Sequence, residues 1–286
     1  MNKQSTRSNN TTYFALLFFA AMTVVGVTTA HVQDTINPLV STTGPNVLGS
    51  GHIQWNTSLM WDHTRNFNIN GTVGFDGVGA RTGFRFGIGN RAELTLGVEA
   101  SHSVFNKRER SMAGSVISVN DLISPTNMKI APSVGARLLL FEGKGWLPMV
   151  TFNTSIAMAA TKGYKYESDT VVQPTIGLEF RNDLGKGWML DYAVDFTWNR
   201  NSPRQNFPAT TLSVFARWLA TERLLIGAGF KTPNWTEPFK GLFEVRYLAT
   251  PNLQLTLQGG LSNGNSLGSY WAMETHVVAG VSWMLR

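Results

Sequence analysis

The sequence of 286 residues has no cysteine, little charge and no long apolar stretch. Without cysteine the chain has neither a disulfide framework nor a thiolate metal site. Charged residues make up 15% of the chain, whereas soluble globular proteins average about 25%. No stretch reaches the roughly 18 apolar residues that a membrane-spanning helix requires. Low charge without a long apolar run is typical of a membrane β-barrel, in which only every second residue of a strand must be apolar.

Residues 1–30 are predicted to be a secretory signal peptide. Lys3 and Arg7 give a positive start, and an apolar core follows over Tyr13 to Val27. The core is too short to span a bilayer comfortably, and small residues up to Ala30 suit cleavage. The alternative is an N-terminal membrane anchor.

Residues 31–50 are expected to form an irregular lead-in segment. They contain Pro38 and Pro45 and show no period. Such a segment could hang in the periplasm or fold into the lumen as a plug, and the pattern does not choose between these. Regular alternation begins at Gly51, so residues 51–286 are predicted to form one barrel domain.

The clearest alternation lies after Gly187. One face of the extended chain carries Trp188, Leu190, Tyr192, Val194, Phe196 and Trp198. The other face carries Met189, Asp191, Ala193, Asp195, Thr197 and Asn199. An aromatic face opposite a face with carboxylates indicates lipid on one side and a polar lumen on the other.

The same pattern predicts an all-β, antiparallel up-and-down barrel of about twelve strands, an even number as in bacterial single-chain barrels. The expected strands are 52–61, 78–88, 92–102, 128–140, 148–158, 172–180, 188–198, 210–218, 224–230, 241–249, 253–261 and 273–285.

The connections between these strands are expected to alternate between short periplasmic turns and longer extracellular loops. The expected turns are 89–91, 142–144, 182–186, 221–223 and 250–252. The expected loops are 62–77, 105–127, 160–170, 200–209, 231–240 and 262–271. Both chain ends then lie on the periplasmic side.

Aromatic residues cluster towards both ends of the expected strands, as interfacial girdles require. Those near the turns are Phe180, Trp188, Trp218, Tyr247 and Trp283, and those near the loops are Trp61, Trp198 and Trp271.

Charges of both signs fall on the inward faces. They are Arg81, Arg85, Glu93, Glu99, Lys129, Arg137, Glu179, Arg181, Asp191, Asp195, Arg217, Glu244, Arg246, Glu274 and His276. All of them except Lys129, Arg181 and His276 are candidate pore-lining residues. They form either a structural ion-pair network or the wall of a conduit that selects solutes, because unpaired buried charges cost several kcal/mol.

Signals for other chemistry are weak. Ser262 and the two residues after it resemble the Ser-Asn-Gly core of outer-membrane phospholipase A, but Gly260 stands where that family has its histidine base. Without the base the hydroxyl is not activated, so we interpret the stretch as a loop turn and expect no catalytic residue. The five histidines are scattered, which predicts neither a metal site nor a cofactor.

Partners follow from the expected location. Nucleic-acid binding would need a concentrated basic face, and the only basic cluster, residues 107–110, is expected in a loop that contacts lipopolysaccharide. The ending with Gly280, Trp283 and Leu285 resembles the carboxy-terminal signal that the barrel-assembly machinery reads, although Arg286 follows. The sequence does not indicate an oligomeric state.

Three segments carry a resemblance to a known family. They are a lead-in with Pro38, the opening of the first strand at residues 51–55, and residues 86–94, which contain a "Gly-hydrophobic-x-x-Arg-x-Glu-Leu" turn. Over most of residues 36–286 the chain resembles the family named for the MetA pathway of phenol degradation. The resemblance implies an outer-membrane barrel that acts as a channel or transporter.

We therefore expect a barrel in the bacterial outer membrane through which a small solute passes passively, with hydrophobic or aromatic solutes among the candidates. The main alternative is a structural or adhesive barrel with a plugged lumen. An outer-membrane enzyme such as a phospholipase is the weaker alternative, because no activated nucleophile is evident.

Overall fold

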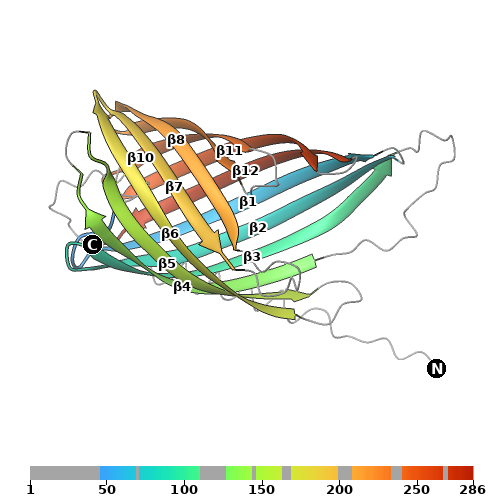
Figure 1. Ribbon diagram of the computed structural model, residues 1–286, viewed down its shortest axis with the longest axis horizontal. Helices are drawn as coiled ribbons and strands as arrows, with labels where there is room; N and C mark the ends of the chain where they lie inside the picture. Colours follow the sequence, from blue (N-terminus) through green and yellow to red (C-terminus); the bar gives the residue numbers. More distant parts are fainter. Residues whose placement is uncertain are drawn as a thin grey trace.

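The computed structural model describes residues 46–68, 71–109, 127–143, 146–162, 169–198, 208–232, 240–266 and 270–285. The predicted signal peptide lies outside this range. Twelve strands form one closed antiparallel barrel (Figure 1), in which each strand pairs with its sequence neighbours and β1 pairs with β12. The strands are β1 Ile53–Asn68, β2 Gly71–Ile88, β3 Ala92–Glu109, β4 Asn127–Phe141, β5 Met149–Lys162, β6 Asp169–Gly185, β7 Trp188–Thr197, β8 Ala209–Thr221, β9 Leu224–Thr232, β10 Lys240–Thr250, β11 Leu253–Ser266 and β12 Tyr270–Met284.

The predicted antiparallel barrel is confirmed. Among the described residues no helix is long and apolar enough to cross a membrane. The register closes the barrel from Gln54 opposite Met284 to Phe67 opposite Trp271. The end of β12 and the turn after β2 lie at one end of the barrel, which is therefore the periplasmic end.

The outer surface is apolar, as lipid requires. Large hydrophobic side chains remain exposed on the outward face of the strands, among them Leu59, Val78, Val134, Ile156, Ile176, Phe230, Leu257 and Val277. Interfacial aromatics pair on this surface. The exposed rings of Trp188 and Trp218 stack at 5.8 Å between centroids, which agrees with the predicted girdle near the turns.

Several predicted connections are wrong, because the strands are longer than the alternation indicates. Residues 62–77 were expected to form a loop, but β1 continues to Asn68 and β2 begins at Gly71, with Asp62 opposite Gly77. Most of residues 262–271 likewise belong to β11 and β12. Residues 107–109 of the basic cluster belong to β3. Beyond the bilayer both faces of a strand meet water, so apolar alternation ends while backbone pairing continues.

The turn between β6 and β7 is tighter than the expected 182–186. β6 runs to Gly185, and the reversal uses left-handed backbone at Lys186 (φ 52°) and Gly187 (φ 80°). A two-residue connection of this kind favours positive φ at both central positions. The turn therefore needs few residues, and the polar sequence before it remains in the strand.

Candidate functional site in the lumen

The first ion-pair network in the lumen surrounds Glu93, whose side chain has no exposed surface. Arg85 Nη2 lies 2.8 Å from one carboxylate oxygen, and Arg137 Nη1 lies 3.0 Å from the other. Arg137 also pairs with Glu179. Two guanidinium groups thus share one buried carboxylate, which offsets the cost of removing these charges from water. We call Arg85, Glu93, Arg137 and Glu179 the Glu93 network.

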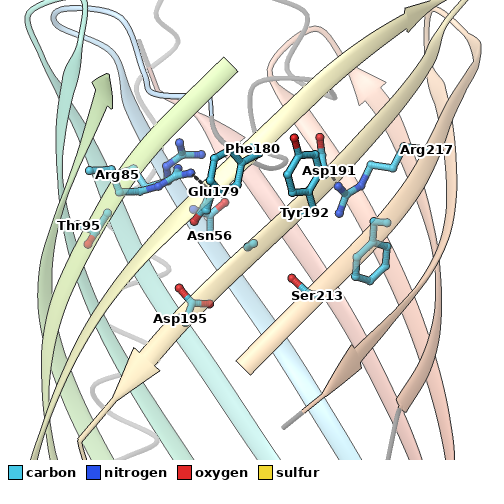
Figure 2. Close-up of a pocket in the computed structure, with 13 residues that line it drawn as sticks. Asn56, Arg85, Thr95, Glu179, Phe180, Asp191, Tyr192, Asp195, Ser213 and Arg217 are labelled. Atoms are coloured by element: carbon cyan, nitrogen blue, oxygen red, sulfur yellow. Dashed lines mark hydrogen bonds and ion pairs between the residues drawn. The ribbon is translucent and has the colours of Figure 1, made fainter. Parts of the chain in front are cut away.

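The second network lies on the wall formed by β6 to β10. Arg181 binds Asp191 through two contacts of 2.6 Å each. Arg217 pairs with both Asp191 and Glu244, and Arg246 Nη2 lies 3.0 Å from Glu244. We call these five residues the Arg217 network. Figure 2 shows Arg85 with Glu179 at one part of the wall and Asp191 with Arg217 at another.

The end of the lead-in segment lies inside the barrel. Arg85 and Arg137 each donate a hydrogen bond to the carbonyl of Asn46, at 2.9 and 3.0 Å. The N–H of Leu48 donates to Glu93 at 2.8 Å, and Leu48 is only 2% exposed. Of the two alternatives for residues 31–50, the described part therefore folds into the lumen. Residues 31–45 lie outside the described range.

Gly87 in β2 allows this approach. A Cβ atom placed there would lie 1.9 Å from the carbonyl oxygen of Gly49. Any side chain at position 87 would therefore displace the segment. Residues 46–49 can therefore lie against the barrel wall only because position 87 is glycine.

Two hollows adjoin inside the barrel. The larger, of about 690 Å³, lies along β1 to β6 and β10 to β12, and the smaller, of about 420 Å³, faces the two networks. Asn56, Arg85 and Thr95 line both hollows, so the hollows are neighbours. Charged and hydroxyl-bearing side chains line part of both hollows, next to apolar side chains, so water-soluble molecules find polar partners there.

The remaining candidate residues take different places. Arg81 binds Glu99 at 2.5 Å, and Lys129 binds the same carboxylate at 3.3 Å. Asp195 accepts a hydrogen bond from Asn153 at 3.3 Å. Glu274 pairs with Lys240 and belongs to neither network. The candidates therefore divide into the two networks, the Arg81–Glu99–Lys129 triad and the isolated positions.

Sequence reasoning missed some contributors to the lumen. Asn46 and Leu48 act through backbone groups, so no side-chain pattern could identify them. Gln54, 1% exposed, accepts a hydrogen bond from Arg85 at 2.9 Å. Its position on the inward face of the first strand was a usable signal. Lys231 and Lys240 were placed in a loop, although both belong to strands.

Ser262 lies in β11 and not in a loop turn, so that expectation is corrected. Its side chain is buried with 4% exposure, and its hydroxyl makes no hydrogen bond in the described part of the chain. His276 is opposite Gly260 in the register and pairs with Asp62. The hydroxyl thus lacks the hydrogen bond to a base that would activate it. The described residues also contain no cluster of histidine and carboxylate side chains that could hold a metal ion.

Comparisons with known proteins show the fold. No known family matches the sequence, and no curated protein matches it. Among solved structures, an outer membrane channel from Pseudomonas putida F1 aligns with a TM-score of 0.58 at 11% identity, covering 83% of this chain and 97% of that one. The P. putida toluene transporter TodX gives 0.47 at 8%, covering 82% and 89%. Outer membrane phospholipase A from Escherichia coli gives 0.43 at 13%, covering 80% and 89%.

The fold and the apolar exterior agree on the location. A closed twelve-stranded barrel with exposed aliphatic side chains on its outer face is an outer-membrane barrel. The protein is therefore a bacterial outer-membrane protein, surrounded by membrane lipid.

Proposed function

We propose that the protein is a channel through which small water-soluble molecules cross the outer membrane passively. The observation that carries the proposal is the pair of adjoining hollows inside the closed barrel, whose linings include charged and hydroxyl-bearing side chains. The sequence alone left hydrophobic and aromatic solutes among the candidates. The charged lining supports polar solutes instead, because a hydrophobic solute would have to displace water from charged groups.

The experiment is conductance in planar bilayers. Purified protein that shifts on unboiled gels, as folded barrels do, should insert and give discrete current steps. Arg91→Gln, which removes an exposed charge at a periplasmic turn, serves as a handling control because, within the described ranges, the Arg91 side chain forms an ion pair with the exposed Glu142 alone. Folded protein that inserts without conducting would contradict the proposal.

A barrel closed by its own lead-in segment is the second candidate. Residues 46–49 lie in the lumen near the end of β2, where Arg85, Glu93 and Arg137 of the Glu93 network hold them by hydrogen bonds. If residues 46–49 close the periplasmic end completely, the wild-type barrel will not conduct ions. A variant that cannot hold this segment against the wall will then conduct. The comparison of these two proteins separates a channel from a closed barrel.

A further inference from the structure

The two hollows differ in charge balance. The lining of the smaller hollow includes three arginines and the three carboxylates Glu179, Asp191 and Asp195. The lining of the larger hollow includes four cations, Arg81, Arg85, Lys129 and Arg246, and a single carboxylate, Glu99. Excess positive charge is therefore concentrated in the larger hollow.

Only some of these cations are available to a solute. Arg85 and Arg246 bind Glu93 and Glu244, and their side chains are 12% and 15% exposed. The Arg81 side chain is 63% exposed and that of Lys129 is 37% exposed. These two cations share Glu99, so the triad keeps one net positive charge that faces the water of the hollow.

A third available cation comes from the other side of the barrel. Lys231 lies in β9, five strands from β2 in the sheet order β9-β10-β11-β12-β1-β2. It is nevertheless within electrostatic range of Arg81, Lys240 and Asp195. It forms no ion pair with any residue that the structure describes. Lys231 thus adds positive charge within electrostatic range of Arg81, with the carboxylate of Asp195 as its strongest electrostatic neighbour.

Neutral hydrogen-bonding groups and apolar side chains also line the larger hollow. The neutral polar groups include Asn56, Ser58, Ser133, Ser155, Gln173 and Ser282. Short hydroxyl side chains leave space and can both donate and accept hydrogen bonds. The hollow therefore offers cations that can bind an acidic group of a solute and hydroxyl groups that can bind the polar groups of the same solute.

We propose that the larger hollow is a weak binding site that makes the channel selective for small hydroxylated carboxylates. The proposal rests on the channel function. The solute carboxylate pairs with Arg81 and Lys129, and its hydroxyl groups exchange hydrogen bonds with the serine and amide side chains. Glu99 limits the net positive charge, so the anion is attracted but also released, which conduction requires.

The test compares gluconate with sorbitol, its uncharged counterpart of similar size. In a potassium chloride gradient the wild-type reversal potential should show preference for the anion. Reconstituted vesicles should admit gluconate several-fold faster than sorbitol. The double variant Arg81→Gln/Lys129→Gln leaves Glu99 without either cation. The anion-to-cation permeability ratio and the gluconate-to-sorbitol uptake ratio should therefore both fall to one or below, whereas Arg91→Gln should leave both ratios near the wild-type values. Lys231→Gln should lower them in the same direction, and it provides an independent variant if the double variant does not fold.

Equilibrium dialysis of labelled gluconate against the folded, detergent-solubilised barrel separates the two possible failures. Wild-type protein that binds gluconate through Arg81 and Lys129 but does not conduct would sustain the site and overturn the channel. A conducting barrel with no anion preference, or one whose preference survives both sets of substitutions, would overturn the site and sustain the channel. A barrel that neither conducts nor binds gluconate would overturn both.

Discussion

Arg217 and Glu244 form an ion pair across an intervening strand. Arg217 belongs to β8 and Glu244 to β10, and Gly227 of β9 lies opposite both in the register. A Cβ atom at Gly227 would lie 3.0 Å from Glu244 Cγ and 3.1 Å from Arg217 Cγ. The missing side chain is what allows groups two strands apart to meet. A glycine in the middle strand thus allows the charges of β8 and β10 to join one network.

Gly227→Val should therefore weaken the barrel. The added methyl groups would force Arg217 and Glu244 apart, and overpacking of this kind costs about 1–3 kcal/mol. Ala228→Val, at the next residue of β9 but on the exposed outer face, is the matched control and should change little. Urea unfolding of the two variants in lipid vesicles measures the difference. Equal midpoints would mean that the pair does not depend on the glycine.

The facing of β7 can be tested with two neighbouring residues. Val194 points to lipid, and Ala193 lines the smaller hollow. Val194→Arg should cost about 2–4 kcal/mol if the site lies near the midplane of the bilayer. Ala193→Arg should cost less because the new charge meets water and carboxylates. The free energy of unfolding of both variants shows which face of β7 points to lipid. Similar losses of stability at the two positions would argue against this assignment.

Arg85 and Arg81 share one face of β2 but should respond differently to substitution. Among the described residues, Arg85→Gln leaves Glu93 with Arg137 as its one remaining cation, and breaking a buried pair costs about 3–5 kcal/mol. Arg81→Gln removes a mostly exposed partner of Glu99, worth about 0–1 kcal/mol. Parallel unfolding curves provide the comparison. A larger loss from Arg81→Gln would contradict the assignment of Arg85 to the structure and Arg81 to the lumen water.

The position of residues 46–49 against the barrel wall should depend on Gly87. Gly87→Ala places a methyl group where the carbonyl of Gly49 lies, so the segment must leave the wall and the conductance should rise. Gly77→Ala is the control in the same strand, because its Cβ would be 3.6 Å from the nearest atom, an ordinary contact. Single-channel recordings measure the conductance of the two variants. Identical conductance in both would show that the segment does not limit passage.

The sequence by itself determined the strands and the direction of their side chains. Val194 and Asp195 are adjacent, yet their opposite faces follow from the two-residue period, which depends only on the local backbone. The same alternation placed Arg81 and Arg85 on the inward side and predicted about twelve strands. It failed beyond the bilayer, as at Asp62, where water meets both faces and the period carries no information.

Only the tertiary structure decided which charges meet. In the sequence Arg81 and Arg85 are equivalent inward arginines, but Arg85 joins Glu93 and the carbonyl of Asn46, while Arg81 shares Glu99 with Lys129. These partners depend on the register between strands and on the path of residues 46–49 into the lumen. Alternation has a period of two and fixes the face of a residue, but not its level in the barrel or the side chain across from it. Partners distant in the chain are set only when the barrel closes.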